Sequence, residues 1–260
     1  IPYVITEHWT RYLPTTNTFN GAFRKWMTRI VARRAAAIMP VTANLRDAMI
    51  DCGLKNNNYI VIPNVVDIDM FSPDPGKKRE GKIRVVHVSC FDDQQKNISG
   101  ITRVIRKLSE IRQDFSVDMI GDGIHYKELV AYGEEMGVKD IYATYSGLKE
   151  NEELAALMKA ADFMLMFSRY ENLPVVILES YACGVPVLST DVGGISEHMN
   201  KDLGILIDSE DEEALFQSMN IMLDTCRDYD AGKIRDYAVA HFSNEVIGYQ
   251  LHDVYNSVAK

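Results

Sequence analysis

The sequence has little that would suit a membrane span, a disulfide-stabilised scaffold or a nucleic-acid surface. Its longest apolar runs, such as Phe163–Phe167, fall far short of the ~20 residues that cross a bilayer. The four cysteines lie far apart without a CxxC pair, which argues against a zinc site and favours a reducing, cytoplasmic compartment. With 28 Lys+Arg against 37 Asp+Glu, the net charge of −9 argues against a nucleic-acid partner, because phosphate contacts need a basic surface.

Several familiar catalytic motifs are absent or incomplete. No HExxH spacing and no GxSxG elbow occur. Gly76–Lys82 resembles a P-loop, but Ile83 stands where Ser or Thr must reach Mg²⁺. Gly121-Asp-Gly123 lacks the third glycine of a dinucleotide fingerprint, and Asp67-x-Asp69 suits turn chemistry better than a metal. We therefore expect no metal and no cofactor.

What the sequence does have is the pattern of a parallel α/β protein. Hydrophobic residues make up 47% and charged residues 25%, an ordinary globular composition. Short apolar runs alternate with helix-period segments, which is typical of parallel sheets. The expected strands are Tyr3–Thr6, Ala37–Val41, Tyr59–Ile62, Ile83–Ser89, Ser116–Ile120, Ile141–Tyr145, Ala161–Phe167, Val185–Ser189 and Gly204–Ile207. The expected helices lie near 21–36, 42–52, 98–112, 125–137, 151–160, 174–183 and 210–226, and two more follow, separated near Ser243.

The clearest seam between domains is Phe71–Gly81, which is rich in proline, glycine and charge. About three strands precede it and at least six follow. We therefore expect the C-terminal part of one Rossmann-like domain and the whole of a second. The expected boundaries are 1–70, a linker at 71–81, the second domain at 82–241, and a helix at 242–260 that packs back on the first domain.

Acidic, basic and glycine residues gather where strands of the second domain are expected to end. Glu171 comes just after the strand that ends at Phe167, where ligands bind in open α/β sheets. Glu179 falls inside the following apolar helix, so it is either paired or facing a ligand, unless this face of the helix is solvated. Lys96 follows another strand, and Gly193-Gly194 follow a third with backbone N–H groups that suit a phosphate. Alone, each has an ordinary surface or turn explanation.

Together these residues resemble retaining glycosyltransferases of the GT-B fold, family 4. The resemblance rests on Glu171-x7-Glu179, followed by Ala-Cys-Gly-Val-Pro-Val and Val-Gly-Gly-Ile-x-Glu. The segment Ile62-Pro-Asn-Val-Val-Asp67 with Phe71 matches the family's interdomain segment. Val117-x-Met-Ile-Gly-Asp-Gly123 matches its V-G-D-G turn. The resemblance covers nearly the whole chain.

The resemblance implies two Rossmann-like domains around a cleft and transfer, with retention, from a UDP or GDP sugar to a glycan or lipid-linked acceptor. Glu179 would bind the ribose hydroxyls and Glu171 the donor sugar. Lys96, with the amides of Gly193 and Gly194, would bind the diphosphate. Thr6-Glu7-His8 resembles the family's active-site histidine turn, so His8 would reach the sugar. The implied function belongs to polysaccharide biosynthesis and needs no metal.

Two departures from the family pattern bear on the diphosphate. Where the family usually has G-R-L-x(3–4)-K-G, this chain has Cys90 in place of the arginine and Asn97 in place of the last glycine. The loss of the arginine predicts either weaker diphosphate binding or another cation that substitutes for it. The glycine-rich loop of the family's first domain is also absent. We expect a fragment that lacks about a hundred residues and transfers sugar poorly or not at all.

Two other functions remain open at this point. A sugar-nucleotide epimerase shares the fold, and a non-catalytic nucleotide-sugar-binding module would also explain the lost arginine. Retention of Lys96, Glu171, Glu179 and His8 together argues against degeneration.

A basic segment at residues 23–34 carries a separate signal. Five basic residues stand there at helical spacing in an otherwise acidic chain. A basic amphipathic helix can rest on anionic lipid, which predicts a peripheral contact with the inner face of a membrane. The alternative is an ordinary packed helix with a basic outer face.

Overall fold

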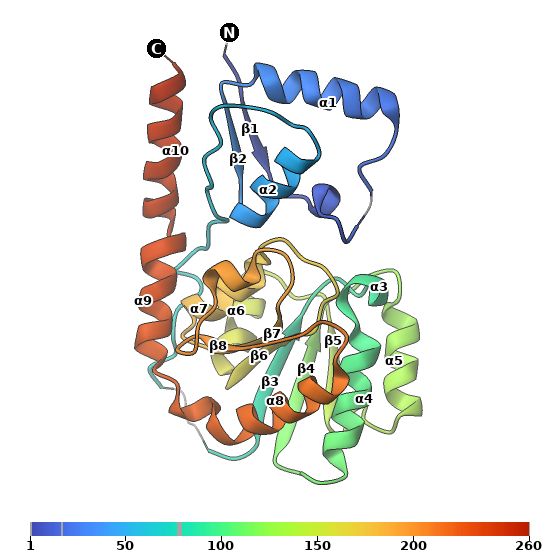
Figure 1. Ribbon diagram of the computed structural model, residues 1–260. Helices are drawn as coiled ribbons and strands as arrows, with labels where there is room; N and C mark the ends of the chain where they lie inside the picture. The colour runs from blue at the N-terminus through green and yellow to red at the C-terminus, as the bar shows by residue number, and fades with distance from the viewer. Residues whose placement is uncertain (1, 17, 77–79, 260) are drawn as a thin grey trace.

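The computed structural model describes residues 2–16, 18–76 and 80–259 and contains two parallel sheets (Figure 1). The strands of the larger sheet lie in the order β5-β4-β3-β6-β7-β8, and all neighbouring pairs are parallel. They are β3 (Ile83–Val88), β4 (Phe115–Ile120), β5 (Ala143–Gly147), β6 (Phe163–Met166), β7 (Val187–Thr190) and β8 (Gly204–Ile207). The predicted α/β class is confirmed.

Helices cover both faces of the larger sheet (Figure 1). Successive residues of β3 show why: Val85 belongs to one apolar cluster and Val86 to the other, because side chains alternate along a strand. One cluster includes α4 (Ile98–Ser109), α5 (Tyr126–Glu135) and α8 (Glu212–Thr225). The other includes α6 (Asn151–Ala160), α7 (Val175–Ala182) and α9 (Ala231–Phe242). The sheet is therefore doubly wound.

The smaller sheet pairs β1 (Val4–Glu7) with β2 (Ala37–Pro40). Its helices are α1 (Ala22–Arg34) and α2 (Ala43–Asp51). The last helix, α10 (Asn244–Val258), runs beside this sheet, and its Ile247 and Val254 pack in a cluster with β2 (Figure 1). The break before α10 falls where the sequence predicts it, and Ser243 Oγ accepts the Val246 N–H at 3.3 Å. The proposed domain boundaries stay a prediction, and residues 77–79 of the predicted linker lie outside the described residues.

The strand expected at Tyr59–Ile62 is reduced to one bridge, Ile38↔Tyr59. Backbone N–H groups of Ile60 and Ile62 do donate to Ile38 and Pro40. Pro40, however, has no N–H with which to continue the ladder, so the pairing stops. The short helix α3 (Asp93–Lys96) was not expected.

Candidate functional site

The order of strands in the larger sheet reverses between β3 and β6, and this reversal marks the candidate site. From β3 the sheet continues to β4 and β5, and from β6 it continues the other way to β7 and β8. In open α/β sheets, ligands bind at such a point, in the crevice beyond the carboxyl ends of the strands. Lys96 follows β3 and Glu171 follows β6, so the fold brings both residues to this crevice.

Lys96 and Glu171 form a buried ion pair. Lys96 is the last residue of α3, and its Nζ donates to Glu171 Oε1. Only 10% of the Lys96 side chain and 7% of the Glu171 side chain are exposed. Taking both charges out of water is costly, and the cost is offset only while both partners are present. The pair thus keeps a cation and an anion ordered at the crevice.

Glu179 lies in α7, the helix that begins just after the loop carrying Glu171. Its Oε2 is buried and has no hydrogen-bond partner within the described residues. Burial raises the pKa of Glu179 to about 7. A buried carboxyl oxygen without a donor is unfavourable in the protein alone, and hydroxyl groups of a ligand could satisfy it. The Glu179 side chain as a whole is half-buried, and this oxygen is its buried part.

Gly193 and Gly194 lie where the backbone passes close to other residues. A Cβ on Gly193, whose φ is 63°, would meet the Glu171 carbonyl oxygen at 2.1 Å. A Cβ on Gly194 would meet Thr42 Cγ2 at 2.2 Å. The Gly194 N–H, expected at a phosphate, donates instead to the Asn172 carbonyl at 2.9 Å. Within the described part of the chain only the Gly193 N–H of this pair lacks an acceptor.

His8 lies at the end of β1 with its ring exposed and its orientation fixed. Its Nδ1 is 2.8 Å from Asn64 Oδ1. The Asn64 amide cannot be reversed without losing the bond from its Nδ2 to the Leu173 carbonyl at 2.8 Å, because a carbonyl only accepts. The Asn64 oxygen must therefore accept, and His8 Nδ1 must carry the proton. His8 then presents Nε2 as a hydrogen-bond acceptor.

Asn172, which sequence reasoning did not single out, joins the two sheets beside Glu171. Its Nδ2 donates to the His8 carbonyl at 3.0 Å, and its Oδ1 accepts from Thr42 Oγ1 at 2.9 Å. Both Asn172 and Thr42 are buried. The residue therefore holds the His8 turn and the Glu171 loop in fixed relation.

Glu197 is a second link that the sequence reasoning missed. It lies in η2 (Ile195–His198), just after the paired glycines, and accepts the N–H groups of Ala43 at 2.8 Å and Asn44 at 2.7 Å. These amides open α2, where a negative charge is favoured by the helix dipole. The signal in the sequence was that the first turn of α2 has no acidic residue of its own.

The two departures from the family pattern have different structural outcomes. Cys90 is exposed. Asn97 has φ 49°, a left-handed conformation that favours glycine and, among other residues, asparagine. Asn97 therefore does what a glycine would do for the backbone there.

Other candidates are assigned by the structure to ordinary roles. Asp67 Oδ1 accepts the N–H groups of Asp69 and Met70 at 3.0 Å, which confirms turn chemistry at that acidic pair. None of the four cysteines, all within the described residues, forms a disulfide. Across residues 2–16, 18–76 and 80–259, no three His, Cys, Asp or Glu side chains gather as metal ligands. In the same part of the chain, every helix is too short or too polar to cross a bilayer.

Helix α1, which covers the whole basic segment 23–34, turns large apolar side chains outward. Phe23 is 74% exposed and Trp26 is 57% exposed. On the inner side, the Arg29 guanidinium donates to the Cys52 carbonyl, and Ala32 is buried.

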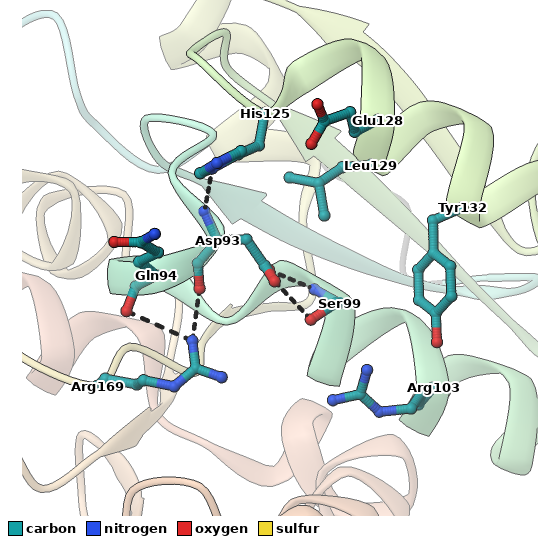
Figure 2. A pocket seen from close by; sticks show the side chains of 9 residues that line it. All are labelled: Asp93, Gln94, Ser99, Arg103, His125, Glu128, Leu129, Tyr132 and Arg169. Atoms are coloured by element: carbon teal, nitrogen blue, oxygen red, sulfur yellow. Dashed lines mark hydrogen bonds between the residues drawn. The ribbon is translucent and has the colours of Figure 1, made fainter.

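A cavity of about 700 Å³ lies beside α3 (Figure 2). Asp93 and Gln94 of α3 line it, and α4, α5 and Arg169 supply the rest of its wall, but none of the predicted site residues does. The members drawn in Figure 2 are Asp93, Gln94, Ser99, Arg103, His125, Glu128, Leu129, Tyr132 and Arg169.

Two family models together match residues 1–231 of the chain. The model for glycosyl transferases group 1 matches residues 71–231, and that for glycosyltransferase family 4 matches residues 1–70. The chain therefore belongs to the group 1 glycosyltransferases.

Two relatives illustrate the range of the family. The chain is 25% identical over 248 residues to an uncharacterized 41.2 kDa protein in the cps region of Klebsiella pneumoniae, covering 89% of this chain and 66% of that protein. It is 27% identical over 247 residues to the MMP alpha-(1->4)-mannosyltransferase of Mycolicibacterium hassiacum, covering 89% and 58%. The chain thus spans between about half and two thirds of the length of the curated relatives that it matches.

Solved structures show the same fold. Anabaena HepE in complex with UDP and glucose superposes with a TM-score of 0.82 at 19% identity, over 98% of this chain and 72% of that one. Sucrose-phosphate synthase from Thermosynechococcus elongatus gives 0.84 at 20% identity, over 99% and 68%. With its two parallel sheets, the chain has the predicted GT-B architecture of Rossmann-like halves.

The buried state of Glu179 predicts a pH-dependent effect of the substitution Glu179→Gln. A folded-state pKa of about 7, above the ordinary value of 4.5, means that Glu179 contributes most to stability below pH 4.5 and loses that contribution as pH rises through about 7. Relative to the parent, the variant should gain free energy of unfolding between pH 5 and pH 8, by up to about 3 kcal/mol. Denaturant titrations across that range measure it, with the exposed Glu135→Gln as control. A difference that does not change with pH would contradict the burial argument.

The hydrogen bonds around His8 predict its tautomer. Nitrogen-15 NMR of the neutral imidazole should show the proton on Nδ1 and an unprotonated Nε2. His125 supplies an internal reference of opposite sense, because its Nδ1 accepts the Asp93 N–H at 3.1 Å and the ring proton must lie on Nε2. Asn64→Ala should shift His8 toward the Nε2–H form and leave His125 unchanged. An Nε2–H form of His8 in the parent protein would show that Asn64 does not orient the ring.

Proposed function

We propose that the chain provides the donor site of a retaining glycosyltransferase that moves a sugar from a UDP or GDP sugar to a glycan or lipid-linked acceptor in polysaccharide biosynthesis, in the cytoplasm. The single observation that carries the proposal is the buried Lys96–Glu171 pair at the switch point of a doubly wound sheet. The Glu179 oxygen without a partner adds a second group suited to a ligand.

Names of related proteins support a sugar-nucleotide donor. HepE has been crystallised with UDP and with UDP-glucose. Relatives of this chain include a mannosyltransferase and a putative colanic acid biosynthesis glycosyltransferase of Escherichia coli. These names favour nucleotide sugars over other ligands of Rossmann-like folds.

Each site residue has a chemical task in this proposal. Glu179 accepts hydrogen bonds from the ribose hydroxyls. Lys96 and the Gly193 N–H donate to the diphosphate, and Lys96 offsets the negative charge that grows as the nucleotide departs. Glu171 keeps Lys96 ordered until the donor arrives, and then contacts the donor sugar.

Retention follows if attack and departure occur on the same face of the sugar. The bond from the anomeric carbon to the phosphate oxygen breaks, the bond to the acceptor oxygen forms, and the acceptor's proton passes to the departing phosphate. His8 Nε2, on the other side of the crevice, accepts a hydrogen bond from a sugar hydroxyl. No resident metal has a task in this scheme. A glycosyl-enzyme trapped on Glu171 would contradict it.

Nucleotide binding is the first test of the proposal. UDP, GDP and ADP, each titrated by calorimetry and thermal shift, should separate, with one stabilising the chain by about 2.7 kcal/mol at a hundred times its dissociation constant. Glu179→Ala should abolish the effect, Glu135→Ala should keep it, and EDTA should not alter it.

Outcomes of that test and of a product assay separate the alternatives. Binding by none of the three nucleotides, or binding that survives Glu179→Ala, would refute the donor site. For a chain that does bind, NMR of the products formed from the matching nucleotide sugar distinguishes transfer with retention from epimerisation of the donor.

We also propose that α1 rests on an anionic membrane surface, where a lipid-linked acceptor would lie. The exposed Phe23 and Trp26 stand among basic residues that include Arg33 and Arg34, in a chain with net charge −9. Aromatic side chains beside cations suit the headgroup region of anionic lipid.

Vesicle sedimentation tests the proposed membrane contact. The chain should sediment with vesicles containing phosphatidylglycerol and much less with phosphatidylcholine alone, because basic residues contribute about 1 kcal/mol each near an anionic surface. Phe23→Ser with Trp26→Ser should abolish sedimentation, whereas Ile124→Ser, at a residue 78% exposed elsewhere, should not. Equal sedimentation of all three proteins would refute a contact through α1.

A further inference from the structure

Arg169 contacts nearly every residue of the short helix that carries Lys96. We propose that Arg169 is a positioning residue that fixes Lys96 for the diphosphate by holding α3 in place, with Asn97 as its partner. This inference rests on the proposed function, in which Lys96 binds the diphosphate.

A helix of four residues cannot hold itself together. It forms too few internal hydrogen bonds to offset the cost of ordering its backbone, and its last carbonyls lack helical partners. Arg169 supplies partners to the carbonyls of Gln94 and Gln95, and a second donor to the Asp93 carbonyl, which already accepts the Asn97 N–H at 3.1 Å. Its Nη1 donates to the carbonyls of Asp93 at 2.5 Å and Gln94 at 3.4 Å, and its own N–H donates to the Gln95 carbonyl at 2.7 Å. The positive guanidinium at the C-terminus of α3 also interacts favourably with the negative end of the helix dipole.

The other end of the contact is Asn97. Arg169 Nη2 donates to Asn97 Oδ1 at 2.9 Å. Asparagine tolerates the left-handed backbone at this position, and unlike glycine it offers an acceptor to the guanidinium. The asparagine of this chain therefore differs from the family's glycine in having a side-chain oxygen, and Arg169 donates to that oxygen.

The remaining contacts of α3 complete a rigid platform (Figure 2). The Asp93 carboxylate accepts from the N–H and the hydroxyl of Ser99, both at 2.7 Å, and His125 Nδ1 accepts the Asp93 N–H. The backbone of α3 is held on these sides, and Lys96 at its end donates to Glu171.

Arg169 and Glu171 belong to the same loop after β6. The residue that binds α3 and the residue that pairs with Lys96 are therefore joined directly through the backbone of this loop. Gln95 Nε2 also donates to the Tyr170 carbonyl at 3.3 Å between them. Residues 169–171 therefore bind α3 along its length while Glu171 receives Lys96 at its end.

Arg169 does not substitute for the arginine that Cys90 replaces. Its Nε donates to Glu210 at 2.8 Å, its Nη1 donates to carbonyls of α3, and its Nη2 donates to Asn97. We therefore expect its effect on a ligand to pass through Lys96.

Affinities for a nucleoside diphosphate and for the matching nucleoside test this coupling. The probe is whichever of UDP, GDP and ADP binds the parent chain, compared with its nucleoside, which lacks the phosphates. Arg169→Gln should weaken binding of the diphosphate about tenfold, equal to about 1.4 kcal/mol, and leave the nucleoside unchanged. Arg169→Lys should not restore it, because an ammonium cannot reproduce the guanidinium fork. Arg103→Gln is the matched control, since Arg103 lines the same cavity but pairs with Glu212 of α8.

A double-mutant cycle separates positioning from general damage to the fold. In a Lys96→Gln background, Arg169→Gln should cause no further loss of diphosphate affinity. Asn97→Gly, which suits the local backbone, should cause a smaller loss that also vanishes in that background. Additive losses, equal loss of nucleoside binding, or unchanged diphosphate affinity in Arg169→Gln would each overturn the inference. If the parent and Arg103→Gln bind no nucleotide at all, the proposed function fails instead.

Discussion

The buried ion pair between Lys96 and Glu171 is the interaction on which the rest of the site depends. Burial of either charge alone would be strongly unfavourable, so each is stable in the interior only because the other is present. The elements that carry the two residues must therefore keep their relative positions. The pair joins the carboxyl ends of β3 and β6, the two strands between which the sheet changes direction. The strand order creates the crevice. The ion pair places a positive and a negative side chain there and restricts the movement of both.

Asparagine side chains carry the connection from this crevice to the smaller sheet. Asn172, in the loop after β6, binds His8 and Thr42 of the smaller part, whereas Asn64 binds His8 and the Leu173 carbonyl of that loop. Glu197 binds the start of α2. An amide can donate at one end and accept at the other, so it can bridge two backbones that approach from different sides. Hydrogen bonds of these neutral amides, together with the Glu197 cap of α2, thus fix the two sides of the crevice relative to one another. One side carries His8, and the other carries Lys96 and Glu171.

Sequence reasoning succeeded where the signal was periodic or local. Alternating strands and helices predicted the parallel sheet, and the motif around Glu171 and Glu179 predicted family membership, which is confirmed. It failed where partners are distant in sequence. Asn172 bonds to Thr42 across 130 positions, and no local pattern marks either residue. It also misjudged Gly194, whose N–H is used by a neighbouring loop, and the Tyr59–Ile62 strand, which a proline in its partner interrupts.

The burial of Glu179 also couples the crevice to protons. Burial raises the pKa of this carboxyl to about 7, whereas hydrogen bonds donated by hydroxyl groups favour its ionised form and lower that pKa. If the crevice takes such a ligand, as proposed, binding near neutral pH releases protons, and the binding enthalpy contains the ionisation heat of the buffer that takes them up. A small fall in pH would then weaken binding of such a ligand, because protons compete with it for the Glu179 carboxylate.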